Sequence, residues 1–230
     1  MIDLFFRIGV FPVILTLAAF RVGQLCQEKW KSPLLNPILI GVVLVSGVLI
    51  ATKTDMAVYN SGIGSISWLM TPATVALAIP MYEQYRALKA NMKAILAGVA
   101  AGAVSCLVLV TVCGIVLKLD RTVLISLMPK SVTSAIGAPL SELFGGMGAV
   151  TTAAIIFSGI FANMLGISFC KLFKITDPVA QGVAFGTAGH VIATTKANEI
   201  SPLVGAVSSL SLVVAGLLTA AILPVMVNFI

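Results

Sequence analysis

The densest polar cluster in the sequence is Pro129-Lys130-Ser131-Val132-Thr133-Ser134, which interrupts an apolar stretch. A lysine at the centre of a membrane helix costs about 2.5–3.5 kcal/mol on insertion scales, so it normally faces a partner or a wet cavity. The ammonium, the three hydroxyls and the backbone groups freed by the proline could bind a small anion. The alternative is a loop just outside a bilayer, with the lysine snorkelling to the headgroups. The candidate substrate-binding residues here are Lys130, Ser131, Thr133 and Ser134.

A second cluster, residues 186–196, contains the single histidine of the chain. Its glycines permit a helix break and a close backbone approach, and its histidine can donate, accept or titrate near neutral pH. In the alternative interpretation, the small residues only allow tight helix packing and the histidine bonds to a neighbouring helix. The candidate residues are Thr187, His190, Thr194 and Lys196.

A third polar segment, residues 71–80, has prolines at both ends of an apolar run. The prolines free backbone carbonyls, and threonine side chains can bond to the backbone instead of to a ligand. The pairing of this segment with the other two makes Thr71, Pro72 and Thr74 candidates as well.

Other chemistry is not indicated. The sequence has no nucleophile elbow, phosphate-binding loop, zinc-protease motif or pair of carboxylates in a polar setting, so we expect no enzyme, cofactor or metal site. The four cysteines lack metal-ligand spacing, and in apolar runs a thiol acts as a small hydrophobe. We therefore interpret all four as structural.

The composition places the chain in a bilayer. Of its 230 residues, 59% are hydrophobic and only 10% are charged, whereas soluble domains carry about 25% charged residues. The net charge of +6 comes mostly from short gaps between apolar runs, as in loops that follow the positive-inside rule. A soluble domain, a nucleic-acid binder and a disulfide scaffold are therefore excluded.

The fold class is all-α: a multi-pass integral membrane protein with about 6–8 membrane segments, including broken or re-entrant helices. About 20 apolar residues are needed for one crossing. The expected segments are about 4–20, 34–51, 63–82, 92–117, 122–143, 147–172, 179–197 and 204–229.

The third, fifth and seventh of these segments are interrupted by proline or glycine. Irregular backbone at membrane depth is tolerated only where it is buried in protein or lines a wet cavity, and such interruptions indicate a transporter's binding site. We expect one membrane domain over residues 1–230. A weak match between the sequences after Pro72 and Pro129 suggests an internal repeat of about 34–118 and 122–229.

Basic residues favour an N-terminus outside the cell. The gaps 21–33 and 83–93 each hold three cations, and two helices separate them, so both gaps can face the cytoplasm. Lys171 and Lys174 then face the cytoplasm only if the segment 122–143 re-enters rather than crosses.

Several motifs resemble the LrgB/CidB family along nearly the whole chain. They are Pro33-Leu34-Leu35-Asn36-Pro37, residues 72–84, Pro129-Lys130-Ser131-Val132-Thr133, Gly186-Thr187-Ala188-x-His190 and residues 205–210. Three positions depart from the family pattern: Gly189 replaces a serine, Lys196 an arginine and Ala135 a proline. Because lysine cannot bind a carboxylate bidentately as arginine does, substrate preference could differ.

The resemblance implies a plasma-membrane (inner-membrane) protein with a small LrgA/CidA-type membrane partner. Bacterial members are described as antiholin-like or as modulators of murein hydrolase export, and a plastid relative moves glycolate and glycerate. We therefore expect a homo-oligomeric carrier of small monocarboxylates such as glycolate, glycerate or pyruvate. The alternative is a holin-type or antiholin-type oligomer, associated through faces such as Gly98-x-x-x-Gly102, that controls autolysis without substrate turnover.

Overall fold

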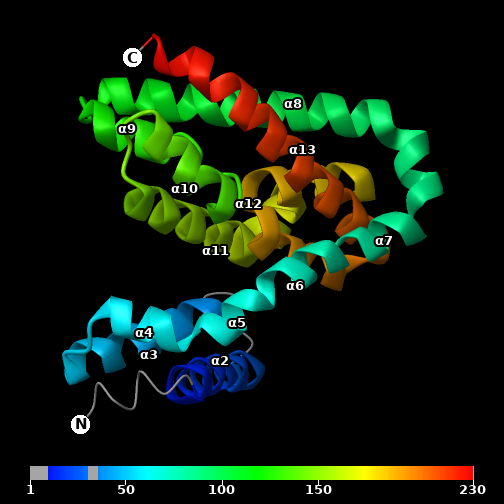
Figure 1. Ribbon diagram of the computed structural model, residues 1–230. Coiled ribbons are helices and arrows are strands. Elements are labelled where there is room, and N and C mark those ends of the chain that lie inside the picture. The colour runs from blue at the N-terminus through cyan, green and yellow to red at the C-terminus, as the bar shows by residue number, and fades with distance from the viewer. Residues whose placement is uncertain (1–9, 31–35, 230) are drawn as a thin grey trace. The chain divides into compact units, whose positions relative to one another are not determined.

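The computed structural model describes residues 10–30 and 36–229, and this part of the chain is helical with no strand. The prediction of an all-α fold is confirmed. The chain forms two compact units, Met1–Ala76 and Leu77–Ile230, which are described separately (Figure 1). The expected internal repeat of 34–118 and 122–229 stays a prediction.

Four described helices are long and apolar enough to cross a membrane. They are α2 (Val10–Trp30), α8 (Tyr85–Val116), α11 (Gly148–Leu172) and α13 (Pro202–Val227), and α3 (Pro37–Thr52) is apolar but shorter. The expected total of six to eight membrane segments goes beyond these four helices and stays a prediction.

The first unit contains α2, α3 and three short helices, α4 (Met56–Gly62), α5 (Gly64–Trp68) and α6 (Met70–Ala76). The expected first segment ended at Phe20, but α2 continues to Trp30; the expected start at Leu4 lies outside the described residues. Polar side chains support this extension, because Arg21 donates to Gln24 and pairs with Glu28 at 3.7 Å. A second link in this unit joins the hydroxyls of Thr16 and Tyr59 at 2.6 Å.

The second unit is built on α8, α11 and α13, and begins with the short α7 (Ala78–Glu83). Buried side chains near the start of α8, such as Ile95, pack with Val207 near the start of α13. Leu107, further along α8, packs with Leu223 near the end of α13. The two helices therefore run in the same direction.

The segment between α8 and α11 folds back on itself. Helix α9 (Arg121–Leu127) is followed by an irregular stretch, and α10 (Ser134–Leu143) then returns. After α10, the N–H of Met147 donates to the hydroxyl of Ser126 at 2.7 Å. A chain that continued straight would separate these residues by about 30 Å at 1.5 Å per residue. Helices α9 and α10 thus form a hairpin with residues 128–133 at its tip.

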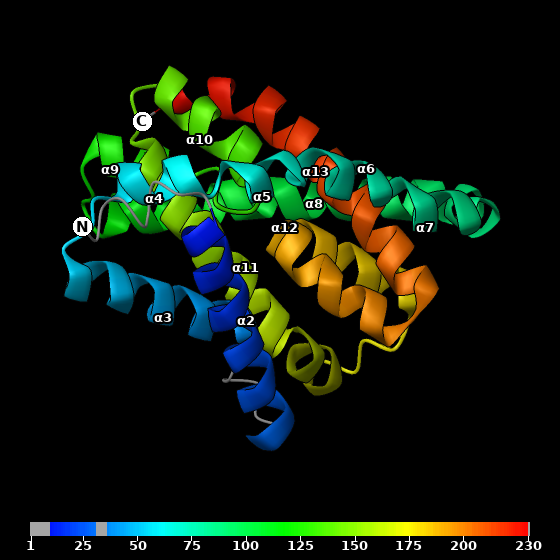
Figure 2. The same cartoon turned by 60° about the horizontal axis from the view of Figure 1, so that its bottom comes forward.

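Helix α12 (Pro178–Ile200) is also a hairpin, because its backbone is non-helical at His190, with φ 43° and ψ −139°. A side chain at Gly182 or Gly186 would meet Val207 or Ser208 of α13, so the first arm (178–189) runs along α13 in the same direction. In the second arm (191–200), Thr194 bonds to Ser208 and Asn198 lies against Gly205, so this arm runs the opposite way. The arms are therefore antiparallel, and Figure 2 shows them beside the first part of α13.

Both hairpins are followed by a long helix, α11 after the first and α13 after the second. The α9–α10 hairpin starts at the end of the unit where α8 finishes, and the α12 hairpin starts where α11 finishes. The start of α11 lies beside α9, which follows the end of α8, and Asp177 after the end of α11 lines the same cavity as Asn91 near the start of α8. The two hairpins therefore enter the unit from opposite ends. Their tips contain the proline and glycine clusters that predicted interruptions.

Candidate functional site

The tips of the two hairpins are joined through the middle of α11. The hydroxyl of Ser158 donates to the backbone carbonyl of Lys130 at 2.6 Å, and also lies 3.0 Å from the carbonyl of Ile155. The Nε2–H of His190 donates to the same Ile155 carbonyl at 2.9 Å. These bonds attach the two predicted residues, Lys130 and His190, to adjacent turns of α11.

The hydrogen bonds continue from His190 into α13. The hydroxyl of Thr194 donates to the carbonyl of His190 at 2.8 Å and lies 2.8 Å from the hydroxyl of Ser208. A non-glycine residue with positive φ costs of order 1–3 kcal/mol and persists only where its surroundings fix it. The bonds on both sides of His190 supply that constraint, and His190 and Thr194 are buried.

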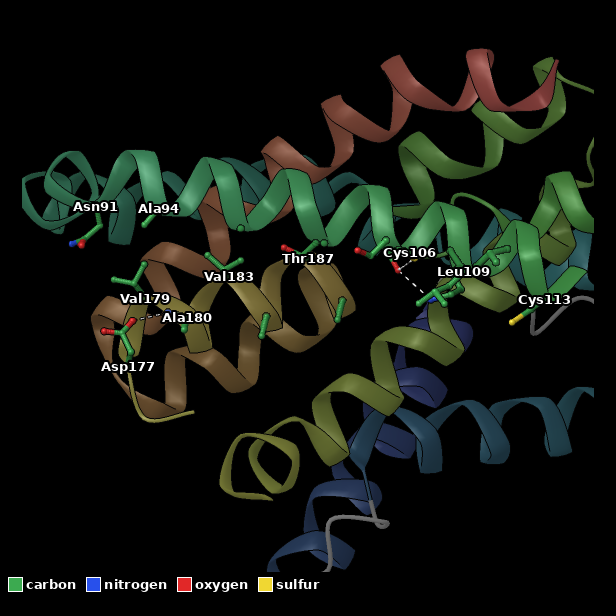
Figure 3. Close-up of a pocket in the computed structure, with 18 residues that line it drawn as sticks. Asn91, Ala94, Cys106, Leu109, Cys113, Asp177, Val179, Ala180, Val183 and Thr187 are labelled. Carbon is green, nitrogen blue, oxygen red and sulfur yellow. Dashed lines mark hydrogen bonds between the residues drawn. The ribbon is translucent and has the colours of Figure 1, made fainter. Parts of the chain in front are cut away.

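A cavity of about 960 Å³ lies between α8 and the first arm of α12. Asn91 and Asp177 line one end, Cys113 lines the other, and Thr187 lies between them on α12 (Figure 3). Lys130 is the one cation among the described residues that line this cavity, and its ammonium is 3.3 Å from the Ser131 hydroxyl.

The depth of Lys130 follows from two helices with long uncharged stretches. Ser131 contacts the thiol of Cys106 at 3.2 Å, and Cys106 lies halfway between Lys93 and Lys118 on the α8 segment. Lys130 is bonded to Ser158, which lies near the middle of the uncharged stretch that ends at Lys171. Both contacts lie near the middle of long uncharged stretches, as expected for a tip inside the apolar layer. This placement argues against a loop outside the bilayer.

Thr187 lines the cavity and carries a buried hydroxyl. Its Oγ1 is buried and has no hydrogen-bond partner among the described residues. The buried hydroxyls of Ser209 and Ser211 on α13 also have no partner among the described residues, and leaving such a group unsatisfied costs about 1–3 kcal/mol. The Thr187 methyl lies 2.7 Å from the ideal Cβ position of Gly102, one helical turn from Cys106. Thr187 and Ser131 thus contact adjacent turns of α8, about 6 Å apart along the helix.

The remaining predicted residues of this unit lie around the site rather than in it. Thr133 and Ser134 begin α10 and are half-buried. Lys196 forms an ion pair with Glu199. Unlike Lys130 and Ser131, these three residues are not in the lining of the 960 Å³ cavity.

The predicted residues Thr71, Pro72 and Thr74 lie on α6, in the first unit. Thr71 and Pro72 are exposed. Their contribution to binding stays a prediction.

Three contributors to the site were not predicted from the sequence. Cys106, interpreted as structural, contacts Ser131 and lines the cavity. Ser158 bonds to Lys130, and a side chain at Gly159 would meet the His190 ring at 2.7 Å. The one available signal was the Ser158-Gly159 pair in the middle of an uncharged helix.

A second cavity of about 930 Å³ lies on the other side of the first α12 arm, against α11. Its wall is mostly apolar and includes Phe157 and Phe161. Lys130 and two alanines of the first arm, Ala184 and Ala188, line both cavities. The Lys130 side chain therefore lies at the border between them.

The glycines expected to drive oligomerisation are used within the chain. An ideal Cβ at Gly98 would lie 3.1 Å from Val183, and one at Gly102 would lie 2.7 Å from Thr187. Both neighbours belong to the first arm of α12. The Gly98–Gly102 face thus packs α12 against α8.

Comparisons with known proteins agree with the sequence motifs. The model of the LrgB-like family matches residues 16–229. The antiholin-like protein LrgB of Bacillus subtilis (strain 168) is 34% identical over 221 residues, which are 96% of each chain. Proteins of the same name from Bacillus mycoides (strain KBAB4) and Bacillus cereus (strain B4264) are 33% identical over the same shares. No solved structure matches the chain.

Proposed function

The chain belongs to the LrgB family, and we propose that it carries small monocarboxylates, of the size of glycolate, glycerate or pyruvate, across the plasma membrane. The observation that carries the proposal is Lys130, which lines a cavity halfway along two apolar helices. Lys130 forms no ion pair with any acid that the structure describes, and an ammonium at that depth attracts an anion. The carboxylate binds Lys130 and Ser131, and a polar group at the other end of the substrate reaches Thr187.

The size of the substrate follows from the spacing of these side chains. Ser131 contacts Cys106, and the methyl group of Thr187 faces Gly102 one helical turn away on α8, so one small acid can lie beside both residues. His190 positions the tip of α12 through its bond to Ile155.

Charge supports one orientation of the second unit. Five cations lie where α8 begins and α11 ends, namely Arg86, Lys89, Lys93, Lys171 and Lys174. The opposite end carries Lys118 and Arg121 together with Asp120 and Glu142. By the positive-inside rule the first end faces the cytoplasm. The α9–α10 hairpin folds back instead of crossing, so α11 returns to the side from which α8 starts. All five cations therefore share that side.

The test is uptake of labelled glycolate and pyruvate by proteoliposomes that contain the full chain, with and without a small LrgA/CidA-type partner. We expect saturable uptake that other small monocarboxylates compete with. Lys130→Ala should lower it at least tenfold, and Lys130→Arg should retain part of it because the charge is kept. Lys196→Ala, which removes a cation outside the cavity, is the matched control. Equal uptake by wild type and Lys130→Ala would remove Lys130 from the mechanism.

The alternative function is that of a holin-type or antiholin-type oligomer, which the names of the relatives favour. A pore of that kind would pass larger solutes without saturation. Efflux of fluorescent solutes of increasing size separates the two functions, because a carrier should release none of them.

A further inference from the structure

A third cavity, of about 530 Å³, lies where α11 ends and α12 begins. We propose that this cavity binds an anionic phospholipid, with the phosphate between Lys171 and Lys174 and an acyl chain against the apolar wall. The inference is independent of the cargo, because this cavity shares no lining residue with the 960 Å³ cavity and only the apolar Cys170 and Ile175 with the 930 Å³ cavity.

The lining combines two cations with an apolar wall. Lys171 and Lys174 are exposed and line the cavity together with Thr176 and Gln181. The apolar side is formed by Ile167, Cys170, Ile175 and Ile200. The described lining contains no acid. Because basic pockets between membrane helices bind anionic headgroups, the lining is complementary to a phospholipid rather than to a cation or a neutral solute.

The neighbouring acids do not neutralise these lysines. Asp177 caps α12 by accepting a bond from the N–H of Ala180 at 2.8 Å, and it lines the Lys130 cavity instead. Glu199 is paired with Lys196. The two lysines therefore keep their charge for an external anion.

The backbone holds the site in one shape. The N–H of Ile175 donates to the carbonyl of Cys170 at 2.8 Å, and the side-chain amide of Gln181 donates to the carbonyl of Ile175 at 2.8 Å. Lys174 has φ 55°, in the left-handed region that commonly ends a helix. The site lies at the end of a membrane-length helix, where headgroups are found.

The experiment is native mass spectrometry of the detergent-purified full chain with palmitoyl-oleoyl phosphatidylglycerol, and with phosphatidylcholine of the same chains. Two lysines near a membrane surface each contribute about 1 kcal/mol to anionic lipid binding, so removing both should weaken phosphatidylglycerol binding about thirtyfold. The variants are Lys171→Gln/Lys174→Gln and the charge-retaining Lys171→Arg/Lys174→Arg.

Lys118→Gln is the matched control, because Lys118 also ends a spanning helix with φ 52° but lines none of the three cavities. We expect a preference for phosphatidylglycerol in wild type, Lys118→Gln and the arginine variant, and its loss in the glutamine variant. Equal binding of both lipids to wild type, retained preference in the glutamine variant, or equal loss in Lys118→Gln would each overturn the proposal. Displacement of the lipid by inorganic phosphate alone would also overturn it, because the site would then recognise only a free anion.

Discussion

Gly159→Ala tests the link between α11 and the tip of α12. An ideal Cβ at Gly159 would lie 2.7 Å from Cε1 and 2.8 Å from Nε2 of His190. The ring must retreat by about 0.7 Å to reach ordinary contact. Its bond to Ile155, now 2.9 Å, would lengthen beyond hydrogen-bonding distance.

The magnitude follows from the groups left without partners. A buried donor or acceptor that loses its partner costs about 1–3 kcal/mol, while replacing glycine by alanine inside a helix returns up to about 1 kcal/mol. We therefore expect a net loss of about 1–2 kcal/mol of unfolding free energy, together with reduced uptake. The control is Gly47→Ala, because nothing lies within 4 Å of a Cβ at Gly47 on α3. This control should be neutral or slightly stabilising.

The assay is reversible unfolding in mixed detergent micelles, combined with uptake in proteoliposomes. A double-mutant cycle with His190→Ala isolates the clash, because removing the ring leaves room for the alanine methyl. Gly159→Ala should then cost less in the His190→Ala background than in wild type. Additive losses in the cycle, or a Gly159→Ala protein as stable as Gly47→Ala, would refute the proposed contact.

The further predictions concern residues of the 960 Å³ cavity and one ion pair outside it. Thr187→Val should leave the free energy of unfolding unchanged or slightly higher, because the lost hydroxyl has no partner among the described residues. Thr194→Val should lower it by about 1–3 kcal/mol, because the Thr194 hydroxyl donates to the His190 carbonyl. The same unfolding assay compares the two variants. If Thr187 binds substrate, Thr187→Val should also raise the KM for uptake. In a variant whose other cysteines are replaced by alanine, modification of Cys106 by a small methanethiosulfonate reagent should block uptake. Glycolate should slow this modification. Modification at an unchanged rate would show that substrate does not occupy this cavity. Glu199→Gln, which breaks an ion pair outside the cavity, should change stability by less than about 0.5 kcal/mol and leave uptake unchanged.

The long helices were predictable from the sequence, but their exact limits were not. The apolar runs predicted the limits of α11 and α13 and the end of α8 to within a few residues. This was possible because a membrane-crossing helix is recognised by its length and hydropathy alone. The start of α8 at Tyr85 and the end of α2 at Trp30 were missed. Both helix ends contain charged residues, which a helix can hold at the membrane surface. A charged helix end and a charged loop have the same composition, so the sequence alone does not distinguish them.

The folding back of the interrupted segments could not be derived from their own residues. A run broken by Pro129 or His190 can cross or return with the same composition. The contact of Ser126 with Met147 decides one case, and the contacts of both α12 arms with α13 decide the other. For the same reason Lys130 and Thr187 were recognisable as polar residues at membrane depth, whereas Ser158 and Gly159 resemble ordinary helix-packing residues until their neighbours are known.

The opposite directions of the hairpins favour a carrier over a pore. Each tip contributes to one site, Lys130 from the α9–α10 hairpin and Thr187 from the first arm of α12. Movement of one hairpin would open the site toward the end of the unit from which that hairpin enters, and leave the other hairpin closed. A carrier with a single site between two such elements would show saturation and alternating access. A pore needs both ends open at once, which would break the bonds of both tips to Ser158 and Ile155, whereas movement of one hairpin breaks the bond of only one tip.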